Sequence, residues 1–149
     1  MFFVRKYEIF KIKSAYQSFI MGRERLLFEL LTVGPSTNYQ EIEYLCDQLN
    51  QRELDSIIQH NLAKSFDNLD SYHNEYRLTH LIKGEVFIKM GTHSIQVYCQ
   101  GSRMLDLDLF VALSTSTDRF FAIMNEQEEC GWLKPIKYSE RMILENTMM

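Results

Sequence analysis

The stretch KGEVFIKMGTHSIQVYCQG, residues 83–101, decides the fold of this 149-residue chain. Apolar and polar residues alternate strictly on both sides of Gly91-Thr92. Such alternation is typical of strands, and a short connection that contains glycine joins two strands into a hairpin. The sequence therefore predicts an antiparallel hairpin with strands over 85–90 and 94–100.

Further strands and several helices are expected on either side of this hairpin. Residues 4–13 alternate charged with bulky side chains, and the apolar run 119–124 suits a buried strand. Helices are expected after four polar residues that can cap a helix. The first helix is expected over 15–33 after Ser14, and the second from Asn38 to Leu49. The third begins at Asn50 and carries Leu54 and Leu62, and the last begins at Ser102. Residues 65–82 have no clean period and are expected to form a loop, with a strand or helical turn around 76–81.

These elements predict an α/β fold, a single-domain sandwich with a mixed, largely antiparallel β-sheet flanked by helices. The chain has the length of one ordinary domain, and it contains no internal repeat or linker. We therefore expect one domain over 1–149, with a tail from about 138 that frays because it has no clear anchor.

Composition excludes several classes of protein. The formal charge of −4 and the pI of about 5.6 argue against direct binding to nucleic acid. The N-terminus lacks the uninterrupted apolar region of a signal peptide, and no apolar run is long enough to span a membrane. Three widely spaced cysteines suit free thiols in a reducing compartment. These features predict a cytoplasmic protein that does not insert into a membrane.

Catalytic signatures are missing from the sequence. The four histidines and three cysteines have no metal-ligand spacing, and no nucleophile elbow or phosphate-binding loop occurs. Cys99 lies in a predicted strand, where a buried structural thiol is the usual case. Asp106 and Asp108 would point to different sides of a helix and are expected to be solvated. We therefore predict no catalytic residue, no metal and no cofactor.

The first predicted helix carries two apolar stripes. Phe19, Leu26, Leu30 and Val33 have the spacing of a core face, whereas Tyr16 and Ile20 lie on another side that continues to Glu24. The third helix is similar, because Leu54, Ile58 and Leu62 form one stripe and Ile57 lies one turn from Glu53 on a neighbouring face. Two interpretations are open for Tyr16, Ile20 and Ile57. They form a partner-binding patch, or the core is wide enough to bury both apolar stripes of each helix.

Several motifs together resemble the SirA family of sporulation inhibitors of replication in Bacillus-type bacteria. They are the strand motif Y-x-I-F-K at 7–11, MGRERLLFELL at 21–31, KGEVFIK at 83–89 and CGWLKPIK at 130–137. The similarity runs from the first strand to Lys137, with a variable middle. The motifs are specific as an ordered set, whereas each alone would be weak.

This resemblance implies a non-enzymatic inhibitor that binds domain I of the replication initiator DnaA. By position, the family's partner contacts fall on Tyr16 and Ile20 of the first helix and on Glu53 and Ile57 of the helix over 50–63. The family pattern has aromatic residues at both first-helix positions, and this chain departs from it with the aliphatic Ile20.

The motif residues themselves are expected to be structural. Gly22 costs stability inside a helix, so it is expected to let another element pack closely, while Arg23 and Glu24 anchor the helix through polar contacts. In the closing motif, Gly131, Trp132 and Pro135 are expected to be structural, with Trp132 filling the edge of the core.

Two other functions remain open from the sequence. One is a small cytoplasmic enzyme or ligand-binding domain with a pocket near Trp132 and the hairpin over 85–100. The other is an inhibitor that binds DNA directly, which the acidic pI disfavours.

Overall fold

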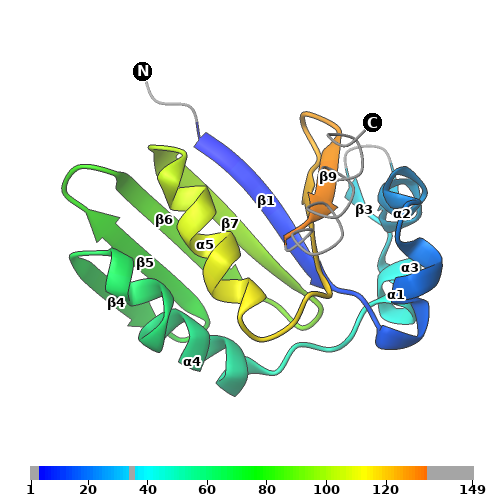
Figure 1. The fold of residues 1–149 in the computed structure, drawn as a ribbon, viewed down its shortest axis with the longest axis horizontal. Helices are drawn as coiled ribbons and strands as arrows, with labels where there is room; N and C mark the ends of the chain where they lie inside the picture. The colour runs from blue at the N-terminus through cyan, green and yellow to red at the C-terminus, as the bar shows by residue number, and fades with distance from the viewer. Residues whose placement is uncertain (1–3, 34–35, 134–149) are drawn as a thin grey trace, which may run out of the picture.

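The computed structural model describes residues 4–33 and 36–133 of the chain (Figure 1). Seven strands form one sheet in the order β4-β5-β6-β7-β1-β8-β9. They are β1 (Val4–Lys11), β4 (Asn68–Tyr72), β5 (Glu75–His80), β6 (Gly84–Met90), β7 (Ser94–Gly101), β8 (Phe120–Met124) and β9 (Glu129–Trp132). Every strand pair among the described residues is antiparallel, and the predicted α/β fold is confirmed.

The predicted hairpin is the pair β6 and β7, in register from Gly84 opposite Gly101 to Met90 opposite Ile95. The two glycines have φ angles of +122° and +126°. A Cβ atom on Gly84 would lie 2.2 Å from the carbonyl oxygen of Gln100, and one on Gly101 would lie 2.2 Å from that of Lys83. Both positions therefore need glycine, for the backbone conformation and for the close approach of the two strands.

A second hairpin occupies the segment that was expected to be a loop. Strands β4 and β5 pair from Asn68 opposite Thr79 to Tyr72 opposite Glu75, and His73 in the turn has a φ of +55°. The strand allowed around 76–81 is confirmed as β5. The loop expected before it was wrong, because β4 is an edge strand whose side chains are mostly exposed. Its sequence therefore lacks the apolar alternation that marks a half-buried strand.

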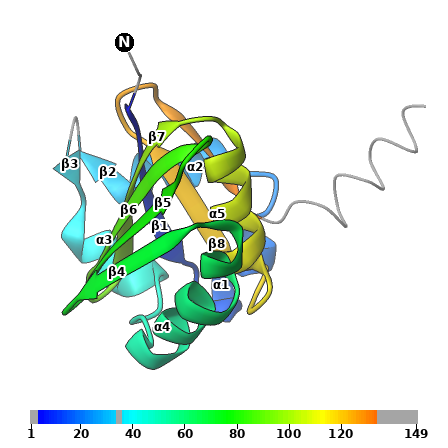
Figure 2. The same cartoon turned by 90° about the vertical axis from the view of Figure 1, so that its left-hand side faces the viewer.

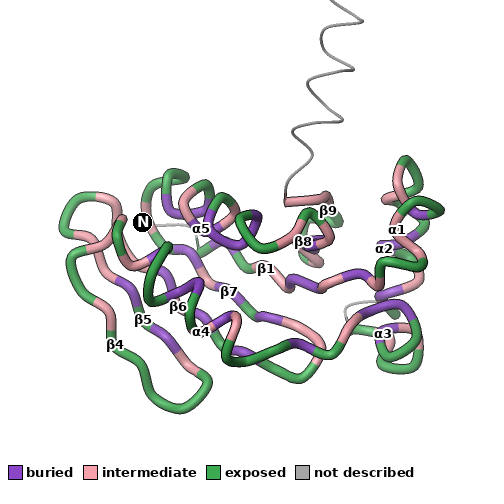
Figure 3. Tube along the Cα trace, turned by 60° about the horizontal axis from the view of Figure 1, so that its bottom comes forward, coloured by how far each residue is buried: buried purple, intermediate pink, exposed green. Residues whose placement is uncertain are grey.

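Helices lie on both faces of the sheet (Figure 2). They are α1 (Ser14–Ile20), α2 (Glu24–Leu31), α3 (Tyr39–Leu45), α4 (Gln51–His60) and α5 (Met104–Ser114), with the 3₁₀ helix η1 (Leu62–Ser65) and the small strands β2 (Thr32–Val33) and β3 (Ser36–Thr37). Successive side chains of β1 point to opposite faces. Ile9 packs in a core with α4 and α5, whereas Phe10 packs in a second core with α1, α2 and α3. Figure 3 shows the buried stretches along β5, β6 and β1, between exposed turns.

The single helix expected over 15–33 is two helices, α1 and α2, separated by Met21, Gly22 and Arg23. Three non-helical residues change the phase of the helical repeat. As a result, Leu27, Phe28 and Leu31 are buried, together with Ile20 of α1. The stripe that was expected to face the core is largely exposed, at Phe19, Leu26 and Val33.

Gly22 is required for its backbone conformation and not for close packing. Its φ is +86°, and a Cβ atom at this position would meet no atom within 4 Å. The expectation that another element packs against Gly22 is therefore wrong. The glycine supports a turn that a side chain would strain.

We expect Gly22→Ala to lower the free energy of unfolding by about 1–2 kcal/mol, because an L-residue in this region of φ is strained. Gly22→Leu should cost no more than Gly22→Ala, since the surrounding space is open. Thermal unfolding of the three proteins measures both effects. If Gly22→Leu were much less stable than Gly22→Ala, close packing at Gly22 would be the explanation after all. If Gly22→Ala melted at the wild-type temperature, the explanation from the positive φ would be wrong.

The remaining helices differ from expectation at single ends. Helix α3 stops at Leu45 instead of Leu49, because the chain there bridges to the end of β1 through Ile12 and Cys46. Helix α4 begins as expected, with the Asn50 side chain accepting a hydrogen bond of 3.2 Å from the backbone N–H of Glu53.

The two carboxylates of α5 were expected to be solvated, and this was wrong. Asp106 is buried and accepts hydrogen bonds from the Arg5 guanidinium at 2.8 Å and 2.7 Å and from the Tyr7 hydroxyl. Asp108 pairs with the Lys83 ammonium at 2.8 Å. The two side chains do point to different sides of α5, as predicted, and each ties the helix to a different part of the sheet.

Candidate partner-binding surface

An exposed aromatic surface lies on α1 and α3. It consists of Tyr16 and Phe19 of α1 with Tyr44 of α3. The rings of Tyr16 and Tyr44 stack with their centroids 5.4 Å apart and their planes at 27°. Phe19 and Tyr44 are each 61% exposed. Aromatic side chains of this kind are enriched at the centres of protein interfaces.

The end of β1 holds the two helices together. Ile12 bridges to Cys46, which follows α3, and the N–H of Lys13 donates a hydrogen bond of 2.9 Å to the carbonyl oxygen of Leu45. The start of α1 therefore lies beside the end of α3. This contact brings Tyr16 and Tyr44 together. The periodicity of the two helices does not predict it, because the residues are far apart in the sequence.

Buried residues below the aromatic surface fix the orientation of both helices. Ile20 of α1 and Ile42 and Leu45 of α3 belong to the same core. Because these residues point inward, Tyr16 is left at the rim and Tyr44 points outward. The aromatic surface is therefore presented on helices whose positions are set by packing.

Polar groups complete the environment of the aromatic surface. The Arg23 guanidinium lies 4.7 Å from the centre of the Phe19 ring, and it donates a hydrogen bond of 2.5 Å to the carbonyl oxygen of Phe19. Hydrogen bonding with Tyr44 raises the pKa of the Tyr16 phenol above its ordinary value. The Tyr16 phenol is therefore neutral near neutral pH, which favours its burial in a complex.

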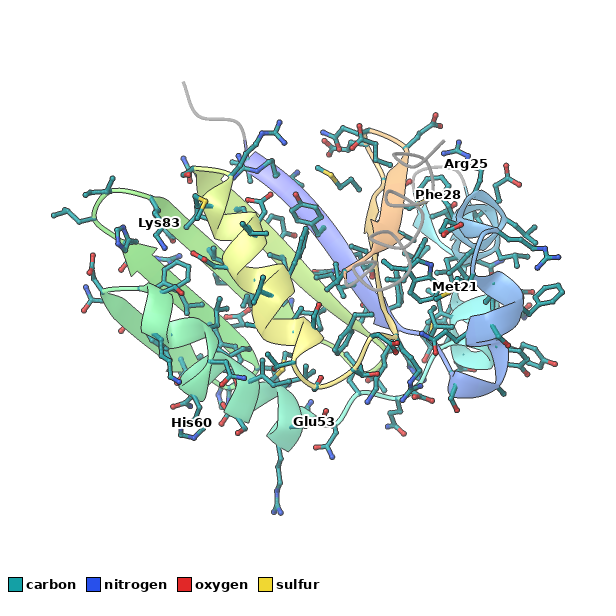
Figure 4. All side chains as sticks on the ribbon, in the orientation of Figure 1. Met21, Arg25, Phe28, Glu53, His60 and Lys83 are labelled. Atoms are coloured by element: carbon teal, nitrogen blue, oxygen red, sulfur yellow. The ribbon has the colours of Figure 1, made fainter. Side chains whose placement is uncertain are left out.

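The four residues that the resemblance implied as contacts do not form one surface. Tyr16 is half-buried at the aromatic surface, but Ile20 and Ile57 are buried. They belong to the cores on opposite faces of the sheet. The inference that both isoleucines stand apart from the core is wrong, and the alternative of a wide core is confirmed for them. Figure 4 shows Glu53 on α4, well apart from Met21 and Phe28.

Sequence reasoning missed Tyr44 and misplaced Phe19. The phase of α3 could have indicated Tyr44, because Ile42 and Leu45 point inward and leave Glu43 and Tyr44 outside. Phe19 was assigned to the core stripe because the break at Gly22 was not foreseen.

Cys130, Gly131 and Trp132 of the closing motif lie in β9. Trp132 packs its ring against Phe121, with centroids 5.2 Å apart, at the edge of the core below α2. The Cys130 thiol contacts the carbonyl oxygen of Glu24 at 3.6 Å, which links β9 to the start of α2. Gly131 has open space around it, and Pro135 lies outside the described residues.

The hollows of the described residues do not resemble a catalytic site. One of about 560 Å³ is lined by Lys6, Glu8, Gln96 and Tyr98 on the sheet, but not by Trp132. No cluster of histidine, cysteine and carboxylate groups in the described parts of the chain could hold a metal ion. Burial raises the pKa of the Cys46 thiol to about 12 and that of the Cys99 thiol further above its ordinary value. Neither thiol is therefore a nucleophile near neutral pH.

Within residues 4–33 and 36–133, no helix has both the length and the apolar character needed to cross a membrane.

Comparison with known proteins identifies one family. The family model described as "Sporulation inhibitor of replication protein SirA" matches residues 5–137, which is most of the chain and includes both helices of the aromatic surface. No curated protein matches the sequence. The members of the matched family are regulatory inhibitors. The chain therefore belongs to the SirA family of sporulation inhibitors of replication.

Proposed function

We propose that this protein inhibits the initiation of chromosome replication by binding domain I of DnaA in the cytoplasm, without catalysing a reaction. Membership of the SirA family supports the inhibitory role. The observation that supports binding through a protein surface is the stack of Tyr16 on the exposed ring of Tyr44.

The proposed contact is the aromatic surface of α1 and α3. Tyr44 and Phe19 are anchors that a partner can bury, and Tyr16 supports Tyr44 from the side. A few aromatic anchors supply most of the binding energy in a typical interface, and the polar residues around them exclude water. On α3, Gln40 and Glu41 lie one turn before Tyr44 and would form part of that polar rim.

The positions on α1 and α4 have different roles in this proposal. Ile20 does not contact the partner in this proposal. Its burial in the core fixes the position of α1, which carries Tyr16 and Phe19. Glu53 and Ile57 belong to α4, which packs on the other face of the sheet. They are therefore outside the proposed surface.

Inhibition follows from competition for DnaA. An inhibitor bound to domain I covers a surface that DnaA needs for its own assembly or for other regulators. No bond is made or broken, so the proposed mechanism needs no cofactor.

Calorimetric titration of the full chain with purified DnaA domain I tests the proposal. We expect saturable binding with a 1:1 stoichiometry. A parallel titration with duplex DNA should show no comparable binding, because the protein is acidic. Absence of heat with domain I at several temperatures would reject the proposed partner, and salt-sensitive binding to DNA alone would support the direct DNA-binding alternative.

A further inference from the structure

The turn between β5 and β6 carries the two most exposed large apolar side chains of the described residues. Leu81 is 93% exposed and Ile82 is 87% exposed. Turns of this kind are normally built from glycine, proline and short polar residues. Because removing apolar side chains from water is favourable, this pair indicates a contact with another molecule.

Hydrogen bonds from the backbone hold the turn in one conformation. The N–H of Leu81 donates to the Asp67 carboxylate at 2.7 Å. The next two N–H groups, those of Ile82 and Lys83, donate to Nδ1 of His80 at 3.1 Å and 3.0 Å. Three successive N–H groups are therefore satisfied within the chain. A turn that is already fixed loses little conformational freedom when its apolar side chains are buried by a partner.

A hollow of about 480 Å³ lies beside the two apolar side chains. Leu81 and Ile82 form part of its wall, and Gln100, Gly101 and Ser102 at the end of β7 form another part. A protruding apolar pair and a recess therefore occur next to each other on one surface.

The hollow carries no unpaired charge. Lys83 and Glu85 are the charged residues that line it. The Lys83 ammonium pairs with Asp108 at 2.8 Å, and the Glu85 carboxylate pairs with Arg77 at 2.9 Å. Two identical surfaces with a net charge repel each other, whereas a charge-balanced surface can face its own copy.

Helix α5 adds apolar surface next to the turn. The N–H of Ser102, just before α5, donates a hydrogen bond of 2.7 Å to the carbonyl oxygen of Lys83, so the turn and the start of the helix lie side by side. The exposed residues of α5 are all apolar, at 50%, 52% and 56% exposure, and they are Met104, Leu107 and Val111. Together with the two turn residues they present on the order of several hundred Å² of apolar surface, a size that marks interaction sites. A standard interface buries about 800 Å² on each partner, and the polar lining of the hollow can supply the remainder.

From these observations we propose that two copies of this protein associate through this end, each inserting Leu81 and Ile82 into the hollow of the other. In a twofold-symmetric interface the same surface serves both partners, so that a protrusion has to lie beside the recess that receives its counterpart. The β5–β6 turn and its hollow have this arrangement. A different protein as partner would require no such pairing of protrusion and recess on one surface.

The proposed dimer leaves the aromatic surface of α1 and α3 free. Figure 4 shows Lys83 at the end of the molecule opposite to Met21, which follows α1. An assembly of two copies would therefore present two aromatic surfaces. Self-association goes beyond the proposed function, and it can be tested without DnaA.

Sedimentation velocity of the full chain over a range of concentrations tests the proposal. We expect a monomer–dimer equilibrium in the wild type. Ile82→Asp should raise the dimer Kd by at least about a hundredfold, because the substituted anchor occurs twice in a twofold interface. The side chain is almost fully exposed, so the variant should melt at the wild-type temperature.

Tyr72→Asp is the matched control, because this side chain is 71% exposed on β4, and it should dimerise like the wild type. A wild type that remains monomeric at about 1 mM, the weak limit of specific association, would overturn the proposal. So would an Ile82→Asp variant that dimerises like the wild type, or a dimer that is lost in Tyr44→Ala, which would place the contact on the aromatic surface.

Isotope-filtered NMR on a mixture of labelled and unlabelled protein tests the insertion itself. We expect nuclear Overhauser contacts from the Leu81 and Ile82 methyl groups of the labelled copy to Thr79 and Gln100 of the unlabelled copy, because both residues line the hollow. A dimer whose intermolecular contacts were confined to α5 would contradict insertion of the turn.

Discussion

Replacing Tyr44 by alanine is expected to weaken the binding of DnaA domain I by about 1–3 kcal/mol, which raises the Kd roughly fivefold to 150-fold. Tyr44 is 61% exposed and is supported by its stack with Tyr16. The substitution removes an aromatic anchor without opening a cavity in the core. Titration calorimetry gives the affinity, and an unchanged thermal melt would show that the fold is intact.

Tyr16→Ala should have an effect of similar size, because it removes the side chain against which Tyr44 stacks. The double variant should lose less than the sum of the two single losses, since the residues are in contact. Tyr72→Ala is the matched control. This tyrosine is 71% exposed on the edge strand β4, and we expect its loss to change the binding energy by less than about 0.5 kcal/mol. If Tyr44→Ala bound domain I with full affinity and Glu53→Ala bound it weakly, the proposed surface would be wrong and the contact would lie on α4.

Asp106→Asn is expected to lower the free energy of unfolding by about 3–5 kcal/mol, because it leaves the buried Arg5 charge without its partner. Arg5 and Asp106 are both buried, and two hydrogen bonds of 2.8 Å and 2.7 Å join them. Urea unfolding at neutral pH measures the loss. Asp108→Asn is the control, because its pair with Lys83 is more exposed, and it should cost no more than about half as much.

The same pair predicts a dependence of stability on pH. Burial disfavours the charged form of Asp106, but hydrogen bonds from Arg5 and Tyr7 outweigh it and hold the pKa of the carboxyl group below its ordinary value. The stabilisation is therefore complete above the unfolded-state pKa of about 4 and is lost as the pH falls through the lower folded-state value. Unfolding measured between pH 7 and pH 2.5 should show this loss in the wild type. The gap between wild type and Asp106→Asn should narrow at acid pH, and a constant gap would contradict the explanation.

The hairpin over 85–100 could be predicted from sequence because each of its strands has one buried face. The buried residues recur at every second position along each strand, and an apolar residue stands at each of these positions. Strand β4 could not be predicted, because an edge strand with exposed side chains does not need an apolar residue at every second position. The break at Gly22 was also missed, since a glycine costs a helix little enough that helices tolerate it. Its positive φ depends on the tertiary structure.

The candidate site was predictable only in part. Tyr16 was identified by the family resemblance and by its position beside the first apolar stripe. Tyr44 lies beside Tyr16 because Lys13 and Ile12 pair with the end of α3. This long-range contact cannot be predicted from the sequence of either helix. Ile20 and Ile57 were placed outside the core and are buried in it. A helical wheel gives the direction of a side chain but not the width of the core that the helix packs against.

The central position of β1 has a consequence for the order of events during synthesis. This N-terminal strand pairs with β7 and β8, so that Val4 meets Gln100 and Lys11 meets Phe120. The helices of the aromatic surface rest on Phe121 and Ile123 of β8. A nascent chain contains all the residues of that surface by residue 46, yet it lacks the strand below them until more than seventy further residues have been made. Pairing over such separations is slow, and we therefore expect the inhibitor to become competent for binding only after its synthesis is almost complete.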